Sequence, residues 1–192
     1  MSSSLRTQPR RLRAPRRMRA PFVPRVQVAR PPASFLHPAS RADVLDLLRR
    51  AGAECTYGLR AVRLAAPSRA DGDGLLFGRL IVPGRIDLYA QPVPPWVLPG
   101  RLPADEEDRL RRAGAEIAPA GGGTQTVVAW PGDTLRRFML LDVLLHELGH
   151  HVLQHERRAP AGRIVRTRDH EAFAEQFARR CRERLELVTT GE

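Results

Sequence analysis

The sequence predicts a mixed α+β domain in which a small β-sheet packs on a central helix and a second long helix. Three observations predict this class. Runs of β-branched and aliphatic residues bounded by Pro and Gly occupy the first half of the domain. A helix-length stretch that is apolar nearly all round follows, as expected for a buried helix. A charged amphipathic helix then ends the chain, and about 150 residues suffice to bury one such core.

The expected elements follow in order along the chain. Ser40 is a favourable N-cap for a helix that runs to Arg50, and Gly52 ends that helix. Pro83-Gly84 is a strong turn signal and predicts a hairpin. The sequence further predicts strands at 57–64, 75–82, 85–91 and 124–130, a proline-rich loop at 92–103, and helices at 104–115, 135–157 and 168–187.

The positive charge is concentrated at the N-terminus. The chain has 32 basic and 21 acidic residues and a net charge of +11, and residues 1–42 contain ten arginines and no acid. Because repeated prolines prevent a helix and like charges repel, we expect residues 1–38 to be a disordered basic tail and residues 39–192 to form the domain. The tail 1–42 is a candidate arm for nucleic-acid phosphates. The alternative is a solvated tail that reflects an arginine-rich composition.

Cysteine usage and hydropathy indicate the cellular setting. Cys55 and Cys181 are too few for a disulfide framework and too far apart in sequence for a cysteine metal knuckle. No apolar run approaches the roughly 20 residues that span a bilayer, and the N-terminal arginines are not followed by the apolar core of a secretion signal. These features predict a cytoplasmic protein with no membrane partner.

The central helix contains His146-Glu147-Leu148-Gly149-His150. Residues four apart lie one above the other on a helix face, so the two imidazoles converge on one point. Imidazole nitrogens bind Zn²⁺ at about 2.0–2.1 Å. Glu147 lies beside that point, where it can accept a proton from water at the metal. Glycine inside a helix costs about 1 kcal/mol, so Gly149 needs a packing reason, which we expect to be the approach of strand 124–130.

A catalytic zinc site needs a third protein ligand. His151 and His155 point roughly 140° and 180° away from the first histidine round the helix, so we expect both to be packed or at the helix exit. Glu171 and Glu175, in the last helix, are four residues apart and share a face. This spacing predicts one ligand and one carboxylate that orients a histidine. The alternative is a solvated acidic face among neighbouring arginines.

The spacing of these residues resembles that of gluzincins, the thermolysin-like zinc peptidases. The resemblance implies that His146, His150 and Glu171 bind Zn²⁺, that Glu147 is the general base, and that Glu175 supports a histidine. It also implies a zincin-like fold, in which the sheet packs on the helix that carries the first two ligands.

The local sequence is also similar to the small metallopeptidases of the ImmA/IrrE type. The runs that carry this likeness are 136–155 and 171–178, and the resemblance extends over about residues 124–180. The sequence differs from the usual pattern of this family at Glu175, where Asn or Asp is usual. It implies peptide-bond hydrolysis in a protein or peptide substrate, with a regulatory protein as a candidate.

Three functions are compatible with these features. The first is a zinc endopeptidase in which an extended peptide docks along strand 124–130, although this strand is equally compatible with an interior position. The second is a non-catalytic, zinc-stabilised regulatory or nucleic-acid-associated module. Glu147 favours the enzyme, because a structural zinc site has four protein ligands and needs no carboxylate there. The third is a protease tethered to DNA, resembling SprT-type proteins, which usually have a third histidine.

Overall fold

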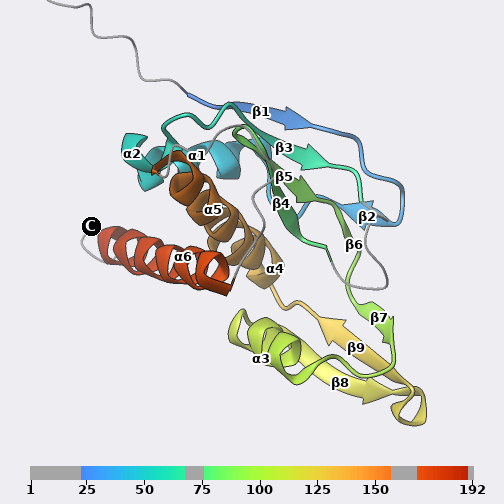
Figure 1. The fold of residues 1–192 in the computed structure, drawn as a ribbon. Coiled ribbons are helices and arrows are strands. Elements are labelled where there is room, and N and C mark those ends of the chain that lie inside the picture. The colour runs from blue at the N-terminus through green and yellow to red at the C-terminus, as the bar shows by residue number, and fades with distance from the viewer. Residues whose placement is uncertain (1–22, 68–75, 157–167, 190–192) are drawn as a thin grey trace, which may run out of the picture.

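The computed structural model describes residues 23–67, 76–156 and 168–189. These residues form a mixed α+β structure, which confirms the predicted class (Figure 1). A four-stranded sheet lies beside a group of helices, and a smaller three-stranded sheet with its own helix lies below them in the view. In the described part of the chain, no helix is long and apolar enough to cross a membrane.

The main sheet has the order β1-β3-β5-β4. Its strands are β1 (Arg25–Val28), β3 (Ala61–Ala65), β5 (Arg85–Tyr89) and β4 (Gly78–Ile81). The first three strands are parallel, and β4 pairs antiparallel with β5. The predicted hairpin at Pro83-Gly84 is thus confirmed. Gly84 has a φ of +86° and lies so close to the Gly58 carbonyl that a Cβ would be 2.6 Å from its oxygen, so both the turn and the packing require glycine.

The prediction of a disordered tail through residue 38 is wrong for its last part. β1 pairs with β3 along the edge of the main sheet, and Val26 is buried against Val62. A further short strand, β2 (Phe35–Leu36), pairs with β6 (Gln91–Pro92). The composition around these strands is rich in Pro and Arg, and the hydrogen bonds that order them come from strands distant in sequence. Residues 1–22 lie outside the described residues.

A three-stranded antiparallel sheet has the order β7-β9-β8. It consists of β7 (Trp96–Pro99), β9 (Gln125–Ala129) and β8 (Glu116–Ala120), with a turn at Gly121–Gly123 between the last two. The predicted loop at 92–103 is therefore wrong at β7, and β8 was not predicted. Helix α3 (Ala104–Arg112) precedes β8 and confirms the predicted helix at 104–115. β7 was not predicted because the prolines at both of its ends are typical of a loop.

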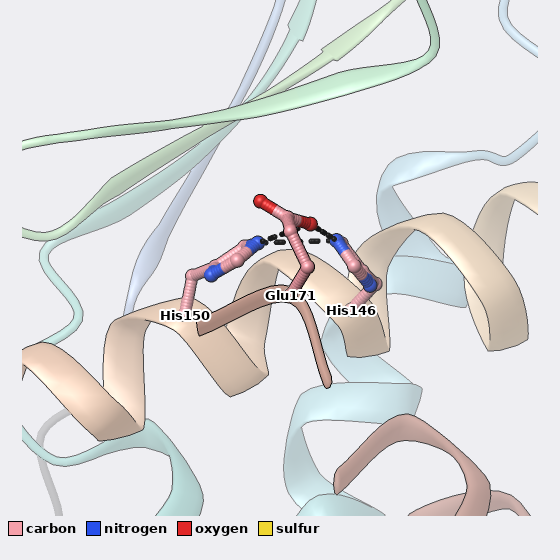
Figure 2. Close-up of side chains that lie close together, drawn as sticks. All are labelled: His146, His150 and Glu171. Atoms are coloured by element: carbon pink, nitrogen blue, oxygen red, sulfur yellow. Dashed lines mark hydrogen bonds and ion pairs between the residues drawn. The ribbon is translucent and has the colours of Figure 1, made fainter. Parts of the chain in front are cut away.

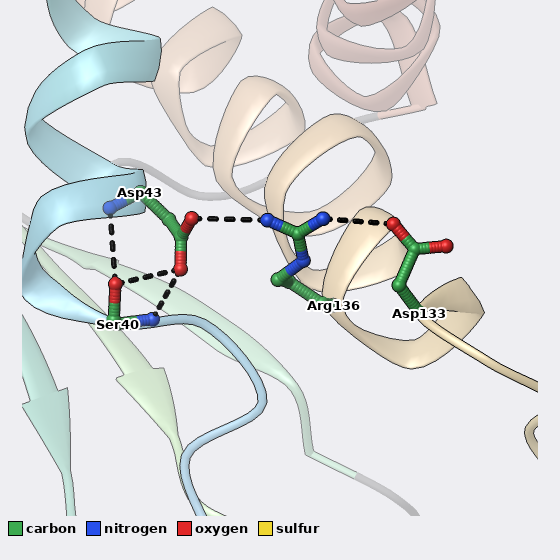
Figure 3. Close-up of polar contacts among 4 residues, drawn as sticks. All are labelled: Ser40, Asp43, Asp133 and Arg136. Atoms are coloured by element: carbon green, nitrogen blue, oxygen red, sulfur yellow. Dashed lines mark hydrogen bonds and ion pairs between the residues drawn. The ribbon is translucent and has the colours of Figure 1, made fainter.

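Helix α1 (Arg41–Ala51) begins with the predicted cap at Ser40 (Figure 3). The Ser40 hydroxyl accepts a hydrogen bond from the Asp43 backbone N–H at 3.2 Å, and the Ser40 backbone N–H donates to the Asp43 carboxylate at 2.8 Å. The Ser40 hydroxyl also donates to the Asp43 carboxylate at 2.7 Å, and this bond, together with the one from the Ser40 backbone N–H, holds the pKa of Asp43 below its usual value. Arg136 binds Asp43 at 3.1 Å and Asp133 at 2.8 Å, which joins the start of α1 to the start of the central helix.

The predicted helix at 135–157 is continuous but not uniform. It consists of α4 (Thr134–Arg137), a π-helical segment (Phe138–Leu144) and α5 (Leu145–Glu156). The short α2 (Ala53–Thr56) lies against α5, and α6 (Arg168–Thr189) packs along it. The buried face of the central helix joins the core of the main sheet through Phe138, Met139, Val143, Leu144, Leu145 and Leu148. The sheet thus supports the segment that carries the predicted metal ligands.

Candidate metal centre

Helix α5 carries His146 and His150 on one face, as their four-residue spacing predicts. Their Nε2 atoms lie 3.1 Å apart, and the two ring planes are nearly perpendicular. The His150 side chain is 6% exposed, whereas that of His146 is 19% exposed. One imidazole is therefore buried in the protein, and the other lies nearer to solvent.

Glu171 reaches the same point from α6 (Figure 2). Its Oε2 atom lies 3.2 Å from His146 Nε2 and 3.4 Å from His150 Nε2. Figure 2 shows the three side chains pointing toward one another from two helices that are separated in sequence. Within the described ranges, they form the one group of His, Cys, Asp and Glu side chains whose donor atoms are close enough to hold a metal ion.

The three donor atoms have the spacing that a tetrahedral zinc ion requires. Ligands bound at about 2.0–2.1 Å in tetrahedral geometry lie about 3.3 Å from one another, and the observed separations are 3.1, 3.2 and 3.4 Å. Two imidazole nitrogens and one carboxylate oxygen are also a donor set typical of catalytic zinc. The residues present could therefore hold such a metal, in the spacing of their donor atoms and in their chemistry.

Glu147 lies between α5 and the main sheet. Its side chain is buried, and the backbone N–H of Leu80 in β4 donates a hydrogen bond to Glu147 Oε2 at 2.7 Å. Gly78 is in the same strand, and a Cβ there would be 2.6 Å from Val143 and 3.3 Å from Glu147 Cγ. The close approach of β4 therefore holds the carboxylate in place beside the two histidines that precede and follow it in the helix.

The structure revises the predicted docking strand. β9 is the central strand of the three-stranded sheet, with β7 on one side and β8 on the other, so the interior position is the one observed for 124–130 and the edge position is excluded. The strand beside α5 is β4, which is an edge strand of the main sheet. A β-run at 75–82 was predicted from composition, but no local signal placed it against the helix, because that contact is between distant parts of the chain.

Glu175 does not join the cluster. It is exposed and forms no hydrogen bond or ion pair with any described residue, so this structure brings it to no histidine. The face of α6 that packs on α5 includes the fully buried Ala174. At 100° per residue, Glu171 lies about 60° from Ala174 round the helix, and Glu175 lies about 100° from it. That larger rotation directs Glu175 to solvent.

The two other histidines of α5 pack at the end of the helix, as expected. His151 is buried with its Nε2 atom 2.9 Å from the Tyr57 carbonyl oxygen. Burial lowers the pKa of His151 and favours the neutral ring. His155 packs edge-on against the Tyr57 ring, with 5.0 Å between the ring centres. Both therefore fix the segment that follows α2 and lie apart from the three donor side chains.

Gly149 has the predicted packing function, but its neighbour is a helix and not a strand. A Cβ at Gly149 would lie 2.9 Å from Ala174 Cα and 3.2 Å from Phe177 Cβ. Contacts below 3.0 Å with backbone atoms cannot be relieved by a side-chain rotation. The absence of a side chain at Gly149 thus lets α6 approach α5 closely enough for Glu171 to reach the histidines.

We expect Gly149→Ala to destabilise the protein and to weaken metal binding. The added methyl group gains up to about 1 kcal/mol of helix propensity, but overpacking of this kind typically costs about 1–3 kcal/mol. Denaturant unfolding measures the first effect, and zinc titration of the folded protein measures the second. Zinc affinity equal to that of the wild type would contradict the role of this contact in placing Glu171.

The chain was also compared with known proteins. No protein-family model, curated protein or solved structure matches it. The features that bear on function are the donor triangle formed by His146, His150 and Glu171 and the buried carboxylate of Glu147.

Proposed function

We propose that this protein is a zinc-dependent peptidase with a minimal zincin-like domain. The observation that carries the proposal is the triangle of His146, His150 and Glu171 donor atoms beside the buried Glu147 carboxylate. The three donors come from two helices, and such an arrangement with one remaining position is typical of catalytic rather than structural zinc. The sequence resemblance to gluzincins and to ImmA/IrrE-type metallopeptidases supports the same assignment.

Each side chain has a distinct task in the proposed reaction. When bound, Zn²⁺ supplies Lewis acidity, which polarises a carbonyl group and lowers the pKa of water. Glu147 accepts the proton of the attacking water and delivers it to the leaving amine, as a general base and then a general acid. The hydrogen bond from Leu80 N–H to Oε2 keeps the Glu147 carboxylate in one orientation. Glu171 and the two histidines would hold the metal, and the Glu171 carboxylate would offset part of its charge.

The position of β4 suggests how a peptide is presented to this site. β4 is an edge strand, and it lies against α5 next to Glu147. An extended peptide can add to such an edge through main-chain hydrogen bonds. We therefore propose a protein or peptide substrate that lies along β4, in place of strand 124–130.

Cleavage of a broad peptide library by the zinc-loaded protein tests the proposal. We expect hydrolysis that stops when a chelator removes the metal and returns when Zn²⁺ is added. The extent of metal loading is measured in the same samples by elemental analysis, so that inactivity cannot result from an empty site. If the fully loaded protein cleaves nothing, the alternative of a non-catalytic zinc-stabilised module is favoured.

A further inference from the structure

The outer face of the main sheet carries one arginine from each of its four strands. These residues are Arg25 in β1, Arg63 in β3, Arg85 in β5 and Arg79 in β4. Residues paired directly across strands share a face, as do residues two apart along a strand. The registers Gln27↔Arg63↔Asp87↔Arg79 and Arg25↔Ala61↔Arg85↔Ile81 therefore place all four arginines on the same face.

This face is opposite the helices. The alternate residues of β3 and β5, including Val62 and Ile86, are fully buried in the hydrophobic core together with residues of α1 and the central helix. Figure 1 shows α1, α5 and α6 gathered on one side of the main sheet. Because side chains alternate along a strand, Arg63 and Arg85 point to the other side. The sheet thus separates a helical layer from an arginine-bearing layer.

A buried carboxylate fixes two of these arginines. Asp87 is 1% exposed and lies 2.6 Å from Arg63 Nη2 and 3.0 Å from Arg85 Nε. The Arg63 and Arg85 side chains remain 40% and 42% exposed. Each guanidinium has five N–H groups. Two guanidiniums therefore have more donors than the one carboxylate they share can accept. Donors on both arginines therefore remain available to an oxyanion, and their positions are already set before it binds.

The charge of this face is strongly one-sided. Asp87 is the only acid in the four strands, against four arginines. The other described acids before residue 87 are in the helices, namely Asp43, Asp46 and Glu54. The chain enters β1 directly from residues 1–22, whose sequence contains seven arginines and no acid. This basic segment is thus joined to the edge strand of the arginine-bearing face.

We propose that the outer face of the main sheet, defined by Arg25, Arg63, Arg79 and Arg85, binds the phosphate backbone of a nucleic-acid duplex. Four strands at about 4.8 Å spacing present a surface about 14 Å wide, and a DNA duplex carries one charge per about 1.7 Å of its axis. Arginine suits phosphate because its planar fork binds two oxygens at once.

The composition of the face favours a duplex over other polyanions. Arg25, Gln27 and Arg79 are exposed on this face and Arg63 and Arg85 are partly exposed, with no exposed aromatic ring among its described residues. Single-stranded nucleic acid usually requires aromatic rings on which bases stack, and a membrane surface usually requires apolar side chains that insert. A surface of guanidinium and amide groups instead suits sequence-independent contacts to a duplex backbone. This proposal is independent of the zinc site.

Binding of the full chain to a labelled DNA duplex of mixed sequence, measured by fluorescence anisotropy as KCl rises from about 50 to about 200 mM, tests the proposal. We expect Arg63→Gln and Arg85→Gln, each made singly, to reduce the slope of log K against log salt by about 1. This change corresponds to about eightfold weaker binding at about 100 mM salt. Each single variant leaves one arginine on Asp87, so the buried carboxylate stays paired.

A triple variant separates the loss of phosphate contacts from the effect of an unpaired buried charge on folding. Arg63→Gln/Asp87→Asn/Arg85→Gln removes both guanidiniums together with the charge that they neutralise, and we expect it to reduce the slope by about 2. The matched control is Arg49→Gln on α1, whose arginine is exposed and pairs with Asp46 on the helical side. Thermal unfolding confirms that each variant is folded.

Three outcomes would overturn the proposal. The first is a wild-type salt slope in folded Arg63→Gln and Arg85→Gln, with loss of binding only when Arg10 and Arg11 of the N-terminal segment are changed to Gln. The second is an equal loss in Arg49→Gln, which would mean that only the overall charge matters. The third is tighter binding to phosphatidylserine vesicles than to the duplex at the same salt, with only vesicle binding reduced in the sheet variants.

Discussion

Replacement of Glu147 by Gln is expected to abolish peptide cleavage while the protein keeps its zinc. The amide retains the size of the side chain and an oxygen that can accept the hydrogen bond from Leu80 N–H, but it cannot take a proton from water. Loss of a general acid–base group typically lowers kcat/KM by about 10²- to 10⁴-fold. Cleavage of a selected peptide and elemental analysis of the same samples measure the two parts of this expectation.

Glu175→Gln is the matched control for this variant. It makes the same chemical change at a glutamate that is exposed and separate from the cluster, so we expect wild-type cleavage. If Glu147→Gln cleaves as fast as the wild type, Glu147 is not the base. If Glu175→Gln is as slow as Glu147→Gln, Glu175 takes part in catalysis and is not separate from the cluster in the active protein.

Replacement of Glu171 by Ala is expected to reduce zinc affinity by more than about 100-fold. Loss of a group that only supports a metal ligand already costs about 10- to 100-fold, and Glu171 supplies one of three donor atoms directly. The carboxylate also provides the negative charge of the set, which two neutral imidazoles do not replace. Competition with a chelator of known affinity measures the change.

Thermal unfolding gives a second, independent measure of the same loss. Zinc at 100 times its dissociation constant stabilises the wild type by about 2.7 kcal/mol, whereas Glu171→Ala should gain little at that concentration. Glu175→Ala is the control on the same helix and should respond to zinc as the wild type does. Full retention of tightly bound zinc by Glu171→Ala would show that another residue is the third ligand.

Together the two variants separate binding from chemistry. Glu147→Gln tests the acid–base function at unchanged zinc content, and Glu171→Ala tests the ligand set without removing the base. The sheet variants Arg63→Gln and Arg85→Gln change neither group, so their effect on DNA binding is measured against an intact metal centre.

Part of the fold could be predicted because its causes are local. The N-cap at Ser40, the turn at Pro83-Gly84 and the helix of the metal ligands depend on residues within a few positions of one another. β1 and β7 could not be predicted in the same way. β1 follows Pro24 and begins at Arg25, β7 lies between prolines, and both become strands because distant strands supply their hydrogen bonds.

The metal site also has one part that local sequence determines and one part that depends on tertiary contacts. The four-residue spacing alone determined that His146 and His150 face one point, because an α-helix repeats every 3.6 residues. The tertiary structure decided how Glu171 differs from Glu175. Both lie on one side of α6 by sequence, and the rotation of that helix against α5, permitted at Gly149, brings only Glu171 to the histidines.

The sequence by itself determined the class of the fold, the histidine pair with its glutamate, and the excess of arginine. Each of these is a property of composition or of spacing along one helix. Only the tertiary structure decided that β4 contacts Glu147 and that four arginines from separate strands share one face. Strand order and helix rotation bring together residues that are far apart in the chain, and local spacing carries no information about such contacts.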